Sequence, residues 1–248
     1  MKLSVYFTPL GLTPAAVAGK PVIVLDVLRA TTTIVAALAH GARAVLPTAS
    51  SDEALNLAPN IEKKDRLLTG ERRCVRIPGF DLGNSPLEMT AEVVAGKTLI
   101  MATTNGTPAL VAAESGRPVM VGAVTNFTAT VRAARRASED HDEVAIICSG
   151  KEKFFALEDA YVAGRLAISL LSGKSRAKNA HHLNDGAVAA MDLARKYGTD
   201  WKKPLLASHA ARDLIELKFK PDVLAAAEPV RNDIVPVYQD KRITLSGR

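Results

Sequence analysis

A carboxylate, an arginine and three threonines follow the first strongly apolar run of the sequence. The run is Val22–Leu25, and the segment after it reads Asp26-Val27-Leu28-Arg29-Ala30-Thr31-Thr32-Thr33. A carboxylate at a strand end can bind a metal ion or act as a nucleophile, and Arg29 can hold phosphate oxygens through two parallel hydrogen bonds. Threonine hydroxyls beside the free N–H groups of a starting helix form an anion site. Asp26 and the threonines could also do no more than cap the helix, but these residue types within eight positions favour a functional site.

A second threonine-rich turn has the same placement. It reads Thr103-Thr104-Asn105-Gly106-Thr107 and follows the apolar run Leu99–Met101. Gly106 would allow a ligand to approach the backbone closely. Asn-Gly is also a common turn, so this segment alone is weak evidence for a site.

Two further segments carry acidic residues. Between Gly70 and Pro86 the chain has glycines, arginines, Asn84 and the carboxylates of Glu71 and Asp81, which we interpret as a long polar loop. A purely structural loop of this length is uncommon in a compact domain. The pair Glu158-Asp159 opens a later helix, where acidic residues usually interact with the helix dipole, so metal binding is the less favoured interpretation there.

Composition and charge exclude several classes of protein. The chain has 248 residues, 48% of them hydrophobic and only 4% aromatic, and a net charge of +6. These values argue against disorder and against an aromatic platform for single-stranded nucleic acid. The densest basic stretch, Arg132 to Arg136, is followed at once by acidic residues and fits one solvated helix face. The surplus positive charge is therefore expected to attract a small anion, and no nucleic-acid partner is expected.

Sequence features also bear on the compartment. Two cysteines make no disulfide framework, and prolines and glycines interrupt the apolar N-terminus too early for a signal peptide. No stretch has the length of a membrane span. We expect a cytoplasmic protein without a membrane partner.

The elements that must position these residues alternate between strand and helix. Apolar runs such as Val22–Leu25, Val119–Val121 and Val144–Ile147 predict strands buried on both faces, each followed by a helical pattern. The alternation predicts a three-layer α/β/α fold with a largely parallel sheet. We expect residues 1–248 to form one unit, in which a smaller C-terminal lobe could begin near residues 172–176.

Five segments, taken in order, resemble the 2-phosphosulfolactate phosphatase family. They are Asp26–Ile34, Gly70–Arg72, Gly79–Pro86, Thr103–Thr107 and Leu157–Asp159. The resemblance covers about residues 1 to 170. It implies an α/β fold, dependence on Mg²⁺ and hydrolysis of a phosphate ester, with 2-phosphosulfolactate as the named substrate.

With this resemblance, roles can be assigned to the candidate residues. We expect Mg²⁺ on carboxylates drawn from Asp26, Glu71, Asp81 and Asp159. Phosphoryl oxygens would be held by Arg29 and by the two threonine-rich helix starts, through Thr31, Thr32, Thr104, Asn105, Gly106 and Thr107. Arg72 would bind the sulfonate or carboxylate end of the substrate, and Asn84 would also contact it. The spacing leaves open whether Asp26 attacks phosphorus or positions a water molecule.

Three alternatives remain at this point. The chain could be a phosphatase for another phosphorylated hydroxy acid or sugar, a non-catalytic anion-binding module, or a nucleic-acid binder with steeply salt-dependent affinity. The oligomeric state is open, and a homo-oligomer is compatible with the sequence.

Overall fold

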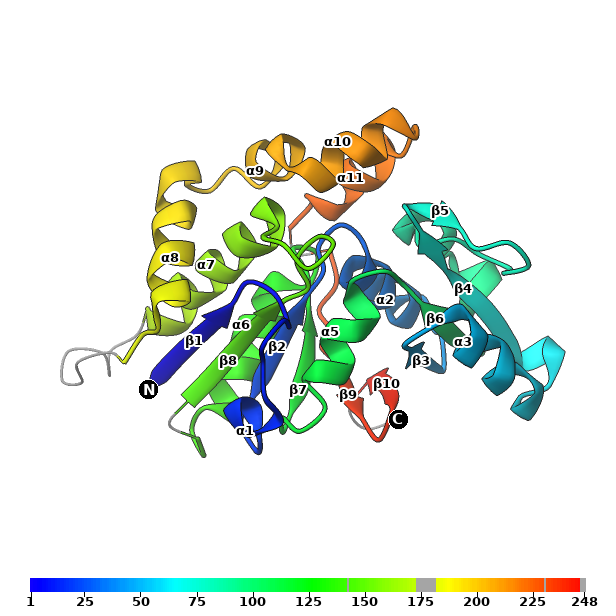
Figure 1. Cartoon of the computed structure of the whole chain (residues 1–248), viewed down its shortest axis with the longest axis horizontal. Helices are drawn as coiled ribbons and strands as arrows, with labels where there is room; N and C mark the ends of the chain where they lie inside the picture. Colours follow the sequence, from blue (N-terminus) through cyan, green and yellow to red (C-terminus); the bar gives the residue numbers. More distant parts are fainter. Residues whose placement is uncertain (142, 173–181, 230, 246–248) are drawn as a thin grey trace.

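A mixed, largely parallel sheet of ten strands forms the centre of the molecule (Figure 1). The computed structural model describes residues 1–141, 143–172, 182–229 and 231–245. In chain order the strands are β1 (Lys2–Tyr6), β2 (Val22–Leu25), β3 (Ala44–Thr48), β4 (Arg66–Arg72), β5 (Val75–Arg76), β6 (Thr98–Ala102), β7 (Val119–Gly122), β8 (Glu143–Cys148), β9 (Pro236–Gln239) and β10 (Arg242–Leu245). The predicted α/β class is confirmed.

The sheet consists of two parallel blocks joined by a hairpin. One block has the order β1-β8-β2-β7 and the other β3-β6-β4, and all pairs within each block are parallel. The β9–β10 hairpin lies between them, with β9 antiparallel to β7 and β10 antiparallel to β3. The short β5 pairs with the end of β4 at the outer edge.

Helices cover both faces of the sheet (Figure 1). They are α1 (Pro14–Val17), α2 (Ala30–Ala39), α3 (Ser51–Leu57), α4 (Ala91–Val94), α5 (Gly106–Ala112), α6 (Phe127–Ala137), α7 (Leu157–Leu171), α8 (Asp185–Tyr197), α9 (Lys202–Ala207), α10 (His209–Glu216) and α11 (Lys220–Ala226). Short 3₁₀ turns occupy Ala58–Asn60, Lys63–Asp65 and Pro86–Glu88. Among the described residues, no helix is both long enough and apolar enough to cross a membrane.

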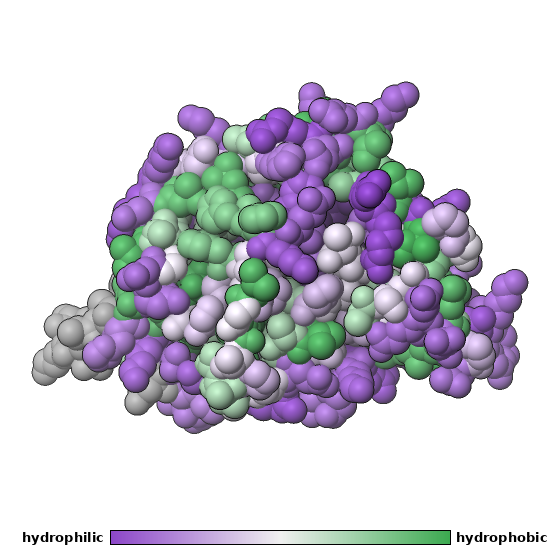
Figure 2. Space-filling view, in the orientation of Figure 1, coloured by the Kyte–Doolittle hydropathy of each residue, from purple (hydrophilic) through white to green (hydrophobic). Residues whose placement is uncertain are grey.

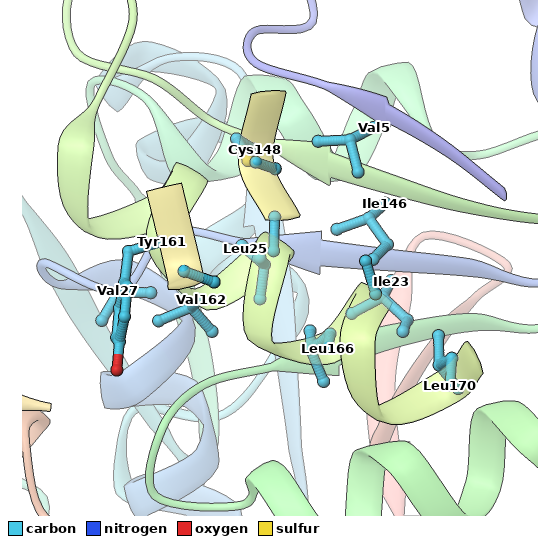
Figure 3. Close-up of a cluster of buried hydrophobic side chains, with 14 of the residues drawn as sticks. Val5, Ile23, Leu25, Val27, Ile146, Cys148, Tyr161, Val162, Leu166 and Leu170 are labelled. Atoms are coloured by element: carbon cyan, nitrogen blue, oxygen red, sulfur yellow. The ribbon is translucent and has the colours of Figure 1, made fainter. Parts of the chain in front are cut away.

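Strand β2 explains why the core has two halves. Its residues alternate between the faces, so that Ile23 and Leu25 pack with α7 and α8 while Val22 and Val24 pack with α2 and α5. Figure 3 shows the first half, with side chains of α7 beside those of β2 and β8. Each such aliphatic side chain contributes roughly 1.5–3 kcal/mol when fully buried. This packing fixes the end of β2, where Asp26 follows.

The segment from Gly70 to Pro86 differs from the predicted loop, because Gly70 to Arg72 complete strand β4 and turn into β5. Gly70 has φ +152°, and a Cβ there would lie 2.0 Å from the carbonyl oxygen of Ala102 on β6. Only glycine fits so close to the neighbouring strand. The prediction missed β4 because a glycine in a short polar stretch normally indicates a turn.

From α8 to α11 the C-terminal part of the chain is helical. Ser208 separates α9 from α10, and its hydroxyl accepts a hydrogen bond from the N–H of Ala211 as an N-cap. Helices α9, α10 and α11 contact one another, and in Figure 1 they lie together at the top of the molecule. The predicted lobe boundary at 172–176 falls almost entirely outside the described residues, which end at 172 and resume at 182.

Candidate active site

A polar pocket lies where the loop after β2 meets several other segments. Its walls come from that loop, the end of β4 with the β4–β5 turn, the loops after β5, β6 and β8, and helices α7 and α10. The lining residues are Asp26, Leu28, Arg29, Glu71, Cys74, Asn84, Asn105, Gly150, Lys151, Glu158, Ala210 and Leu214. Figure 2 shows many hydrophilic residues on the face between α7 and the β4–β5 hairpin. Of the predicted site residues, this pocket brings together Asp26, Arg29, Glu71, Asn84 and Asn105.

Asp26 is buried at the start of α2. Its Oδ1 accepts a hydrogen bond of 3.2 Å from the N–H of Ala30, so the carboxylate does cap the helix. A Cβ on Gly106 would lie 2.7 Å from Oδ2 of Asp26, so only glycine allows the start of α5 to reach this carboxylate. Burial, together with the charge of Glu71, raises the pKa of Asp26 to about 6, although the Ala30 hydrogen bond acts in the opposite direction.

Arg29 is buried and held on three sides. Its Nη1 donates to Oδ2 of Asp222 at 2.7 Å, and its Nη2 donates to the carbonyl oxygen of Cys74 at 2.8 Å. The guanidinium also lies over the ring of Phe219, 4.6 Å from its centroid. Asp222 is fixed in turn by the hydroxyl of Ser85, at 2.8 Å from Oδ1. The position of this arginine is therefore set by residues from distant parts of the chain.

Glu71 and Asn84 line the pocket from the β4–β5 region of the chain. Glu71 accepts hydrogen bonds from the N–H of Thr104 at Oε1 (2.7 Å) and from the N–H of Cys74 at Oε2 (2.8 Å). The carbonyl oxygen of Asn84 accepts a bond from the Thr33 hydroxyl at 3.0 Å. Its side-chain Oδ1 is buried without a partner among the residues that the structure describes. A buried acceptor of this kind is normally satisfied by water or a ligand.

The adjacent residues Glu158 and Asp159 have different positions. Asp159 does not line the pocket, because its Oδ1 accepts from the N–H of Val27 at 2.8 Å and its Oδ2 from the hydroxyl of Ser149 at 3.0 Å. Glu158 does line the pocket, and its buried Oε2 has no partner in the described part of the chain. Burial, with the charge of Asp26 adding to it, raises the pKa of Glu158 to about 7, whereas the pKa of Asp159 is raised by burial and by Glu158.

Lys151 is a pocket residue that the sequence analysis missed. Its Nζ lies 2.6 Å from Oδ2 of Asp213 on α10. Burial alone would lower the pKa of Lys151, but the hydrogen bond and charge of Asp213 outweigh it and raise that pKa. A signal was present, since Lys151 lies in the loop that directly follows the buried strand β8, as Asp26 lies in the loop after β2.

Several predicted residues lie elsewhere. The hydroxyls of Thr31, Thr32 and Thr107 donate to the carbonyl oxygens of Asp26, Val27 and Thr103, so these donors are already used inside the protein. Thr104 is exposed and contributes its N–H to Glu71, while Arg72 donates to the carbonyl oxygen of Glu71 from outside the pocket lining.

Asp81 is also outside the pocket. It is exposed, and its Oδ2 accepts a hydrogen bond of 2.8 Å from the N–H of Leu68 on β4. A carboxylate in a polar loop and a carboxylate that stabilises a strand look the same in the sequence. The structure therefore does not bring Asp81 to the other acidic residues.

The pocket's donor set fits Mg²⁺, which prefers oxygen ligands and usually takes one or two protein carboxylates with water and substrate phosphate. As they stand, the described residues contain no group of three or more His, Cys, Asp or Glu side chains arranged around a metal ion. However, the pocket has carboxylates from Asp26 and Glu71, the unpartnered Oδ1 of Asn84, and a raised pKa at Asp26. Burial and, to a lesser degree, the charge of Glu71 raise this pKa, and a bound cation would favour the ionised carboxylate against both.

The basic stretch of α6 does not form part of this site. Arg132 pairs with Asp233, and Arg135 donates to the carbonyl oxygens of Ser169 and Ser172 at the end of α7, at 2.6 Å each. The predicted solvated helix face agrees with these contacts.

Asp26 is expected to make metal-free stability depend on pH. Its pKa rises from 3.8 to about 6 on folding, so the folded state binds this proton more tightly than the unfolded state. Stability is therefore lost as pH rises from about 4 to above 6, by roughly 3 kcal/mol for this difference in pKa between the two states. In the presence of a chelator, the thermal midpoint of Asp26→Asn minus that of the wild type should be larger at pH 8 than at pH 4. If the difference between the two thermal midpoints did not change with pH, the raised pKa of Asp26 would be contradicted.

Comparisons with known proteins point to one family over nearly the whole length of the chain. The profile of the family described as 2-phosphosulpholactate phosphatase matches residues 6–241. A protein from Carboxydothermus hydrogenoformans is 40% identical over 249 residues, covering 100% of this chain and 98% of the relative. One from Symbiobacterium thermophilum is 37% identical over 228 residues, covering 92% and 95%. Both relatives carry the name "Probable 2-phosphosulfolactate phosphatase".

Proposed function

Because the chain belongs to the 2-phosphosulpholactate phosphatase family, and so to the phosphoric monoester hydrolases, we propose that it hydrolyses 2-phosphosulfolactate to sulfolactate and phosphate with Mg²⁺. One observation carries the proposal. A buried arginine, Arg29, lines the same pocket as the carboxylates Asp26, Glu71 and Glu158. This combination supplies both an anion-binding group and groups that can bind a cation or move a proton.

Arg29 would bind the phosphoryl group. A guanidinium has five N–H donors, and Asp222 and Cys74 take one each. The other donors have no partner among the described residues, so they can contact phosphoryl oxygens, while the contacts to Asp222 and to Phe219 keep the planar group in one orientation. An oriented donor stabilises the charge that spreads over these oxygens in the transition state.

Asp26 and Glu71 would hold the metal ion together with Oδ1 of Asn84. When bound, Mg²⁺ neutralises charge on the phosphoryl oxygens. Asp26 has two candidate roles beyond this one, direct attack on phosphorus or orientation of the attacking water. In either case the carboxylate must be ionised, which the raised pKa opposes and the cation favours.

Glu158 is suited to protonate the leaving group. Hydrolysis breaks the bond between phosphorus and the ester oxygen, and that oxygen leaves with the electron pair and needs a proton. With its pKa raised to about 7, Glu158 holds a proton near neutral pH, and its Oε2 has no partner within the described residues that would compete for it. A donor whose pKa is near the working pH is the efficient choice.

The test is phosphate release from 2-phosphosulfolactate, with and without EDTA. We expect release that stops on chelation and returns with Mg²⁺, and a kcat/KM higher than for phosphorylated hydroxy acids without a sulfonate. Mg²⁺ should also raise the thermal midpoint of the wild type but not of Asp26→Asn, which reports binding independently of turnover. Full activity after exhaustive chelation would refute the metal assignment. No release from any phosphate ester would leave an anion-binding module as the function.

A further inference from the structure

Both cations of the pocket are paired with carboxylates of the C-terminal helices. Arg29 pairs with Asp222 of α11, and Lys151 pairs with Asp213 of α10. The two pairs differ in burial. The side chains of Arg29 and Asp222 are 3% and 4% exposed, whereas those of Lys151 and Asp213 are 16% and 33% exposed.

The pair of Arg29 and Asp222 is expected to stay formed. Asp222 uses one oxygen for Arg29 and the other for the Ser85 hydroxyl. Breaking a pair this deeply buried leaves an uncompensated charge with little access to water, which is strongly unfavourable. Asp222 therefore holds Arg29 whether or not a ligand is present.

In the pair of Lys151 and Asp213, the carboxylate can be replaced by another anion. Pairs in partial contact with water gain little from their charges. The Asp213 carboxylate already reaches solvent, and its Oδ1 lies 3.5 Å from Nε2 of His209, so it would keep other partners if Lys151 were bound by a ligand. An arriving anion could therefore replace this carboxylate at low cost.

The backbone of Lys151 keeps the lysine at the pocket edge. Its N–H donates to the carbonyl oxygen of Phe154 and its own carbonyl accepts from the Phe154 N–H, both at 2.9 Å, which closes a tight turn. The N–H of Glu152 inside this turn donates to Oδ1 of Asn105 at 3.0 Å, so the turn is also tied to the loop after β6. These hydrogen bonds fix the backbone of Lys151, and its side chain lines the pocket from this position.

We propose that Lys151 binds a second anionic group of the substrate, and that Asp213 holds the lysine in position until that group replaces its carboxylate. The inference rests on the proposed function, in which Arg29 takes the phosphoryl group and the substrate carries a sulfonate and a carboxylate besides. Lys151 then takes the role that the sequence analysis assigned to Arg72, which lies outside the pocket lining.

The test measures binding of two probes by calorimetry, sulfolactate and inorganic phosphate. Asp213→Asn removes the competing carboxylate and is expected to tighten sulfolactate binding several-fold. Lys151→Met is expected to weaken it at least about tenfold, as for loss of a charged hydrogen bond, with a smaller effect on phosphate. The double variant should behave as Lys151→Met alone. Glu152→Gln is the matched control, because its carboxylate lies 3.9 Å from the same Nζ and is 69% exposed.

Three results would overturn the inference. These are an Asp213→Asn variant that binds sulfolactate no better than the wild type, a Glu152→Gln variant with an equal gain, or a wild type that binds phosphate but not sulfolactate. None of these results depends on turnover. Conversely, the expected binding pattern without phosphate release from 2-phosphosulfolactate would refute the proposed function and leave this inference in place.

Discussion

Replacing Asp26 with asparagine is expected to reduce kcat by at least about 10³-fold, which corresponds to roughly 4 kcal/mol of transition-state stabilisation. Asparagine keeps the size of the side chain and an oxygen that can accept the N–H of Ala30. It removes the charge that metal binding or nucleophilic attack requires. The measurement is kcat on the purified variant with saturating Mg²⁺.

The same variant should be more stable than the wild type at neutral pH without metal. The raised pKa of Asp26 means that its ionised form is unfavourable in the fold, and asparagine has no ionised form. The matched control is Asp81→Asn, since Asp81 also accepts one backbone N–H but lies outside the pocket. It should retain near wild-type kcat. A less stable but fully active Asp26→Asn protein would assign Asp26 a capping role alone.

Replacing Arg29 with lysine is expected to reduce kcat/KM by at least about 100-fold, the usual effect of losing one oriented transition-state donor. Arg29 contacts Asp222 and the carbonyl oxygen of Cys74 at the same time as it faces the pocket. A lysine ammonium is a compact point charge on a flexible stem. Next to Asp222 it would satisfy that carboxylate and lose the planar arrangement of donors toward the phosphoryl group.

The chain offers a matched control for this substitution. Arg165 also stacks on an aromatic ring, 4.3 Å from the centroid of Trp201, and also donates to a carbonyl oxygen, that of Gly198 at 2.9 Å. Arg165 is not among the residues that line the pocket. Arg165→Lys should therefore lower the thermal midpoint without changing kcat/KM. Near wild-type kcat/KM in Arg29→Lys would show that Arg29 has a structural role only.

The fold could be predicted from the sequence where consecutive residues of a strand are all buried. Strands β2, β7 and β8 are buried on both faces, so their sequences are continuous apolar runs that have few other interpretations. Asp26 could be found for the same reason, because it is the first polar residue after such a run. By contrast, β4 ends in a glycine and two charged residues, and its strand conformation depends on pairing with β6.

The remaining site residues depend on contacts that spacing does not encode. Asp222 meets Arg29 across 193 positions of the sequence, and Asp213 of α10 meets Lys151 in the loop after β8. Glu158 and Asp159 are neighbours on α7, yet only the former lines the pocket. Which of two adjacent carboxylates reaches a ligand is decided by the rotation of the helix on its sheet, and the sequence shows only that both are acidic.

The position of the β9–β10 hairpin has a consequence for how the protein is made. Within the described part of the chain, the hairpin joins the two parallel blocks in the strand order, yet its residues come after the other eight strands in the sequence. During synthesis both blocks leave the ribosome before the strands that join them, and domains tend to fold from the N-terminal side. Until residue 245 has emerged, β7 and β3 each present an open edge, which is a template for unwanted pairing. The edges of β7 and β3 therefore stay open to wrong pairing throughout synthesis, until the hairpin forms and closes both.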